Sequence, residues 1–252
     1  MIPENVGDAA RDGDLETVRA YFEDDSDGAR DVDDICEGIS AVTPLMRCAR
    51  GNDQLTLGNV EVARYLLSRG ASIDKKTLQG QTALLASCYT SGGTVAEMVE
   101  LLLSAGANPN ARNKFNRTAL SAHVTYAQIP SVECVTALLR AGASLDRVYQ
   151  EQTFEDQILD RFSTRERPDP ESFWPAMRAL AAGVRRNGSF KRYLREAHRE
   201  VLLLRGLAMR GHLMPRRRTR GAAEWTAAVA FLARLGDNGV VWNVLSFWRA
   251  TK

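Results

Sequence analysis

The chain has 252 residues, of which 44% are hydrophobic and 25% are charged, as in soluble globular proteins. No apolar run approaches the ~18 residues that a membrane-spanning helix needs, and the acidic N-terminus lacks the basic-then-apolar pattern of a secretory signal. The four cysteines stand singly, without the close pairs of a zinc or redox motif, so we expect reduced thiols and a cytoplasmic or nuclear location without membrane contact.

Charge is distributed unevenly, although the net charge is only +2. Residues 1–34 hold twelve acidic residues against three arginines, a local charge of −9. Residues 185–220 hold twelve Lys or Arg residues against two glutamates, a local charge of +10. The chain is therefore electrically bipolar.

The first predicted element is a short helical unit over residues 8–22, with one apolar and one polar face. An acidic connection from Glu23 to Asp34 follows it. We expect the segment 5–34 to cap the N-terminal end of a stack, because a terminal unit needs a polar outer face.

A pattern with an interval of 36 residues begins after this cap. Its clearest column is a Gly-Ala pair, found at Gly70-Ala71, Gly106-Ala107 and Gly142-Ala143. A pair of leucines precedes each Gly-Ala, and a polar residue follows at a matching offset: Asp74, Asn110 and Asp146. Several independent columns at one period predict stacked copies, each supporting its neighbours.

One copy reads as a turn, a helix, a loop and a longer helix. Gly80 suits a tight turn with positive φ, and Thr82 can cap a short apolar helix from Ala83 to about Tyr89. A second, longer helix follows and ends at Gly106, as helices commonly do at glycine. Neither helix could stay folded alone, because the next copy must cover its apolar face.

These copies resemble the ankyrin repeat. The helix start of that family is matched by Thr43-Pro44-Leu45, Thr82-Ala83-Leu84 and Thr118-Ala119-Leu120. The resemblance implies an all-α solenoid of about five units over residues 1–185. The period exceeds the family's ~33 residues, and we place the extra residues in the loop between the two helices. The family's usual His is replaced by Met46, Leu85 and Ser121, which predicts less rigid loops.

The remaining predicted elements follow the regular copies. Residues 147–185 read as a degenerate last unit, with a first helix starting at Thr153 and a second helix over 172–184. Residues 186–252 form a second domain, a basic helical C-terminal extension. Its expected parts are a basic amphipathic helix over 190–211, an exposed connector over 215–220, and short helices over 222–235 and 240–249. This combination resembles ankyrin proteins of unicellular algae.

Nothing in the motifs points to catalysis. The three histidines, His123, His198 and His212, are scattered, and no nucleophile elbow, phosphate loop or metal-ligand spacing accompanies them. We therefore expect no enzyme activity, no cofactor and no metal.

The ankyrin resemblance implies a non-catalytic scaffold or adaptor that binds a protein partner on its concave face. Partners of that family contact the turn tips and the exposed side of each first helix. Carried over by position, the binding residues are Leu78, Gln79, Gln81, Tyr89, Lys114, Phe115, Arg117, Tyr126, Tyr149, Gln150 and Gln152, and Thr90 and Thr125 belong to the same helix positions. Aromatic residues and Arg often anchor interfaces, but these rings could equally pack against adjacent turns. We expect a monomer.

Two features of the C-terminal extension leave alternatives open. The basic patch Arg216, Arg217, Arg218 and Arg220 reads as a solvated linker, as an import signal or nucleic-acid contact, or as a partner of the acidic N-terminal region. The aromatic segment 242–248 reads as a terminal cap, or as part of a module similar to an F-box or a suppressor-of-cytokine-signalling box. The alternative functions are therefore a substrate receptor of a ubiquitin ligase and a nucleic-acid-associated protein using residues 185–220.

Overall fold

The computed structural model describes residues 1–24, 30–37, 41–52, 54–90, 93–127, 130–146, 152–154, 156–158 and 173–196. The chain divides into two compact units, Met1–Arg185 and Arg186–Lys252. The first unit contains the copies, and the described part of the second ends at residue 196.

Helices make up the regular structure of the described residues. They are α1 (Glu4–Asp12), α2 (Leu15–Glu23), α3 (Pro44–Arg50), α4 (Leu57–Ser68), α5 (Ala83–Ser87), α6 (Val95–Ser104), α7 (Ala119–Tyr126), α8 (Val132–Arg140) and α10 (Phe173–Asn187). An isolated parallel bridge pairs Ile2 with Cys36. The predicted all-α class is confirmed.

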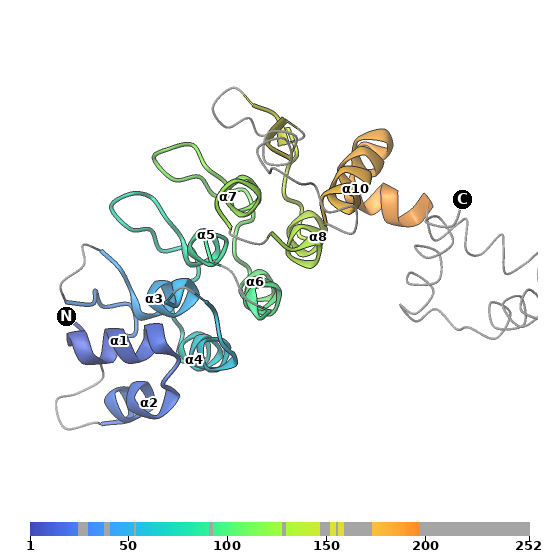
Figure 1. Ribbon diagram of the computed structural model, residues 1–252. Helices are drawn as coiled ribbons and strands as arrows, with labels where there is room; N and C mark the ends of the chain where they lie inside the picture. The colour runs from blue at the N-terminus through green and yellow to red at the C-terminus, as the bar shows by residue number, and fades with distance from the viewer. Residues whose placement is uncertain are drawn as a thin grey trace, which may run out of the picture. The chain divides into compact units, whose positions relative to one another are not determined.

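The helices of the first unit form two layers (Figure 1). The first helix of each copy packs on the next, so that α3 contacts α1 and α5, and α5 contacts α7. The second helices form a parallel row in which α4 contacts α2 and α6, and α6 contacts α8. This arrangement is the repeat solenoid that the 36-residue period predicts.

Leucines at equivalent positions form the core between the layers. Leu45, Leu84 and Leu120 lie in the first helices and Leu66, Leu102 and Leu138 in the second, all at most 2% exposed. Burying one such side chain contributes about 1.5–3 kcal/mol. The stack is held together mainly by these repeated apolar contacts.

The Gly-Ala column ends each second helix. At the first copy, Gly70 adopts φ +90°, its N–H donates to the Leu67 carbonyl at 3.0 Å, and the Ala71 N–H donates to the Leu66 carbonyl at 3.0 Å. This pair of bonds is a Schellman motif, which needs positive φ at the glycine. The next two copies repeat it at Gly106 and Gly142, with φ +94° and +92°.

The first helices are capped by threonine as predicted, and α5 is shorter than expected. The Thr82 hydroxyl accepts the Leu85 N–H at 3.3 Å, and the Thr118 hydroxyl accepts the Ser121 N–H at 3.3 Å. However, α5 ends at Ser87 rather than near Tyr89, because the chain turns at Cys88 toward the loop that leads to α6.

The polar residues after the first two Gly-Ala pairs, Asp74 and Asn110, link one copy to the next. The Asp74 carboxylate accepts the Asn108 N–H at 3.1 Å, and Asn110 Oδ1 accepts the Ser144 N–H at 2.9 Å. Asp33 accepts the Ser72 N–H in the same way at 2.9 Å. A side chain of one copy thus satisfies a backbone donor of its C-terminal neighbour.

Asn59 joins the N-terminal cap to the first full copy. Its side chain is 1% exposed, and its Oδ1 accepts the Thr56 N–H at 2.9 Å to complete a capping box on α4. Its Nδ2 donates to the Arg11 carbonyl at 2.7 Å, near the C-terminal end of α1. One amide therefore fixes the start of α4 against the end of α1.

The degenerate last unit is partly described. The Thr153 N–H donates to the Asp156 carboxylate at 2.9 Å, and the Asp156 N–H donates to the Thr153 hydroxyl at 3.2 Å. Phe154 and Ile158 are buried. In α10, Met177 is buried, and residues 190–196 are helical. The rest of the predicted helix over 190–211, the connector and the two terminal helices lie outside the described residues.

Candidate protein-binding surface

Two turn tips, at residues 77–81 and 113–117, project beside the first helices α5 and α7 (Figure 1). In the first tip, the Thr77 N–H donates to the Gln81 carbonyl at 2.9 Å, and the Gly80 N–H donates to the Thr77 carbonyl at 2.8 Å. The Thr77 hydroxyl also accepts the Gln81 N–H at 3.1 Å. Gly80 adopts φ +76°, a backbone conformation in which most residues with a side chain would be strained.

The second tip reproduces the first with different residues. Asn113 stands 36 positions after Thr77, and its Oδ1 accepts the N–H groups of Phe115 and Arg117 at 2.9 and 3.0 Å. Asn116 stands where the first tip has Gly80 and adopts φ +62°, a conformation that Asn tolerates better than most residues. The same turn geometry thus arises from Thr-Gly in one copy and from Asn-Asn in the next.

The two tips are joined through their backbones. The Lys114 N–H donates to the Gln79 carbonyl at 2.9 Å. A Cβ atom at Gly80 would lie 3.2 Å from the Cα of Asn113 and 3.3 Å from the Lys114 nitrogen. Glycine at position 80 therefore permits both the positive φ and the close approach of the neighbouring tip.

Four predicted binding residues form one cluster, here called the tip surface: Tyr89, Phe115, Arg117 and Tyr126. The Arg117 guanidinium carbon lies 4.3 Å from the ring centroid of Tyr126 and 5.2 Å from that of Phe115. Arg117 Nη1 also donates to the Tyr89 hydroxyl at 3.4 Å, and the two tyrosine rings are 5.4 Å apart. Cation–π and aromatic contacts of this kind contribute about 0.5–1.5 kcal/mol each.

The tip surface is ordered and yet accessible. Phe115 is 54% exposed and Tyr126 is 37% exposed, whereas Tyr89 and Arg117 are half-buried. On the neighbouring tip, Leu78 is 60% exposed. Large apolar side chains are thus held at the surface by a stacked arginine.

The other predicted binding residues have different surroundings. Gln79 and Lys114 are exposed, and Gln81 and Gln152 are half-buried. Tyr149, Gln150 and the basic patch at 216–220 lie outside the described residues. Thr90, expected on the accessible side of the first helix, is instead 6% exposed, because α5 has already ended and its hydroxyl donates to the Ser87 carbonyl at 2.8 Å.

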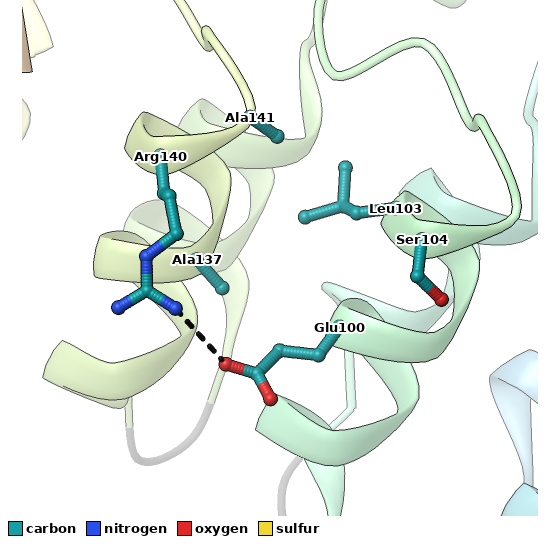
Figure 2. Close-up of a pocket in the computed structure, with 6 residues that line it drawn as sticks. All are labelled: Glu100, Leu103, Ser104, Ala137, Arg140 and Ala141. Atoms are coloured by element: carbon teal, nitrogen blue, oxygen red, sulfur yellow. Dashed lines mark ion pairs between the residues drawn. The ribbon is translucent and has the colours of Figure 1, made fainter. Parts of the chain in front are cut away.

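Sequence reasoning missed a surface groove between the second helices α6 and α8. Figure 2 shows Glu100, Leu103 and Ser104 facing Ala137, Arg140 and Ala141, with an ion pair of 3.8 Å between Glu100 and Arg140. Its volume of about 310 Å³ is at the lower limit for ligand sites. Small residues at 137 and 141 were the available signal, because they leave the space open.

Sequence spacing also missed a buried cluster of Cys88, His123 and Cys134, whose ligand atoms all lie within 4.8 Å of one another. Burial lowers the pKa of His123 to about 4, with the Cys88 backbone opposing the shift. The Ser131 N–H donates to Nε2 of His123 at 2.9 Å, which also requires an unprotonated nitrogen. For Cys134, the hydrogen bond with Cys88 and burial both raise the pKa of the thiol. His123 and Cys134 are therefore uncharged at neutral pH.

The comparisons with known proteins agree with the repeat architecture. Residues 7–113 match the family model of ankyrin repeats in three copies. No curated protein matches the chain. Over the described residues, the helices are too short or too polar to cross a bilayer.

Proposed function

Because this chain is an ankyrin repeat protein, we propose that it is a non-catalytic scaffold that binds a protein partner through the tip surface and the two turn tips. The observation that carries the proposal is the Arg117 cluster. It holds Phe115 and Tyr126 at the surface beside tips that are fixed by backbone hydrogen bonds.

The composition and order of the tip surface favour binding of a protein. Tyr and Arg are enriched among residues that dominate binding energy. Arg117 is already stacked and hydrogen-bonded, so little side-chain entropy is lost when a partner covers it. Exclusion of water by that partner would strengthen the cation–π contacts from about 0.5–1 to about 2 kcal/mol.

The charges beside the tip surface support a partner with acidic groups. Lys114 is exposed on the same tip as Phe115, and Arg112 is half-buried with its Nη1 bonded to Asn116. Between Arg112 and Arg117 the tip carries three basic residues and no acidic one. A partner that presents an apolar side chain flanked by Asp or Glu would match both the rings and the charge.

The proposal is tested by affinity capture from native lysate with the full chain and a Phe115→Ala/Tyr126→Ala variant. Leu57→Ala is the matched control, because Leu57 is 61% exposed but lies on α4, away from the tips. Truncating anchor residues typically costs 2 kcal/mol or more, so we expect capture affinity to fall by about 30-fold or more. The control should retain its partners, and thermal unfolding should show all three proteins folded.

If the double variant captures the same partners in the same amounts, the tip surface is not the binding site. Nuclease treatment of the lysate separates this proposal from the nucleic-acid alternative, since capture through protein contacts survives it. The ubiquitin-ligase alternative rests on residues 222–252, outside the described residues, and no observation favours it.

A further inference from the structure

The buried cluster combines side chains from two adjacent copies. Cys88 is the C-cap residue of α5, His123 lies in α7, and Cys134 lies in the first turn of α8. All three are at most 1% exposed, and their sulfur and nitrogen atoms lie within 4.8 Å of one another. Two thiols and an imidazole therefore converge on one point inside the stack.

The imidazole is incompletely satisfied at this point. Nε2 of His123 accepts the Ser131 N–H, whereas Nδ1 makes no hydrogen bond of normal geometry. A buried polar atom without a hydrogen bond is rare in folded proteins, and an ion or a water molecule is one of the explanations for it. Because Nε2 acts as an acceptor, Nδ1 carries the proton of the neutral ring, and it can bind a cation only after that proton moves to Nε2.

Comparison of the copies indicates that packing alone does not require these residues. Small or apolar side chains fill the equivalent places elsewhere in the stack, fully buried in each case: Cys48 and Ser87 for His123, Ala49 and Val124 for Cys88, and Val62 and Met98 for Cys134. No other described group of three or more His, Cys, Asp or Glu side chains is arranged to hold a metal. The polar combination is specific to the junction between α5 and α7–α8.

The ligand set suits zinc. Thiolate and imidazole bind Zn²⁺ at about 2.3 and 2.0–2.1 Å, which places two coordinated sulfurs about 3.8 Å apart. From separations within 4.8 Å, the side chains need to move by about 1 Å or less. Two thiolates, one neutral imidazole and Zn²⁺ sum to zero charge, which a buried site tolerates far better than a net charge.

We propose that Cys88, His123 and Cys134 form a Zn²⁺ site that links α5 to α7 and α8. On binding, each thiol loses its proton to solvent, so two protons are released for each Zn²⁺ bound. Either ring nitrogen can be the ligand, and in both cases the Ser131 N–H loses its present acceptor. A water molecule completes the coordination, since the described residues supply three ligands.

The test uses the full chain, reduced, stripped of metal and refolded with one equivalent of Zn²⁺, because a buried site loads most readily during folding. Bound zinc is counted after desalting, and proton release is followed in unbuffered solution. The test variants Cys88→Ala and Cys134→Val carry the residues of the equivalent positions Ala49 and Val62, so that the core stays apolar. Cys48→Ser is the matched control, a buried thiol replaced by the residue found at position 87.

We expect one Zn²⁺ per chain and two protons released in wild type and in Cys48→Ser. In the two test variants, affinity should fall by more than about 100-fold, beyond the ~10–100-fold cost of losing an outer-shell partner. Cobalt(II) should give thiolate charge-transfer absorption in wild type that both test variants lose. Zinc in wild type below 0.1 equivalent, or equal zinc in folded test variants, would overturn the proposal. Binding of Cu⁺ without Zn²⁺ would overturn the assignment to zinc.

Discussion

Replacing Gly80 with alanine should disturb the tips more than the same replacement at Gly70. Both glycines have positive φ, +76° and +90°, so alanine is strained by about 1–2 kcal/mol at either position. Alanine also lowers the conformational entropy of the unfolded chain, which stabilises the folded state by about 0.4–1 kcal/mol. The Cβ of Gly70→Ala would meet nothing within 4 Å. We therefore expect the free energy of unfolding of this variant to fall by about 0.5–1 kcal/mol.

At Gly80 a second cost is added, because the new methyl group would lie 3.2 Å from the Asn113 Cα. The neighbouring backbone must shift, and its Lys114–Gln79 hydrogen bond of 2.9 Å weakens. Overpacking typically costs about 1–3 kcal/mol, so the free energy of unfolding of Gly80→Ala should fall by about 1.5–4 kcal/mol in total. Urea unfolding followed by circular dichroism measures both variants. Equal losses at the two glycines would refute the claim that contact between the tips requires glycine at position 80.

Two further predictions concern the core. Asn59→Ala removes the capping-box acceptor for Thr56 and leaves the Arg11 carbonyl without its donor, so we expect a loss of about 2–3 kcal/mol in urea unfolding; a loss below 0.5 kcal/mol would contradict the joining role of this amide. The second prediction concerns His123, whose pKa in the folded chain is lowered to about 4. When a chelator keeps metal away, the unfolded chain therefore binds a proton at this histidine between about pH 6.5 and pH 4, whereas the folded chain does not. Stability should therefore fall by about 2 kcal/mol between pH 7 and pH 5, and His123→Gln, which keeps an acceptor for Ser131, should lack this part of the slope; parallel pH curves for the two proteins would show that the histidine is not buried in neutral form.

The repeated columns of the sequence predict much of the fold, because each column has a local physical cause. Gly70 is needed where a helix ends with positive φ, and Thr82 is needed where a helix begins with free N–H groups. These requirements act within a few residues of the chain. They can therefore be inferred without knowledge of the tertiary structure.

The features that escaped prediction depend on contacts between copies. Cys88 and Cys134 are 46 positions apart and do not occupy equivalent places in their copies, so a period of 36 cannot bring them together. The position of Thr90 was wrong because α5 ends early, a result of the turn at Cys88 rather than of propensity. For the tip surface, sequence position selected Phe115 and Tyr126 but not the stacking of Arg117 between them.

The links from Asp74 to Asn108 and from Asn110 to Ser144 each span 34 positions and run in one direction along the chain. Loss of residues 75–110 would therefore leave Asp74 at the same distance before Ser144 that Asn110 has now, with a carboxylate oxygen in place of the amide oxygen. Duplication of that stretch would likewise insert a copy whose acceptor and donor are already in register. A gene coding for this chain could lengthen or shorten by whole copies without a compensating mutation at these links, which makes the number of copies an evolvable property of the protein.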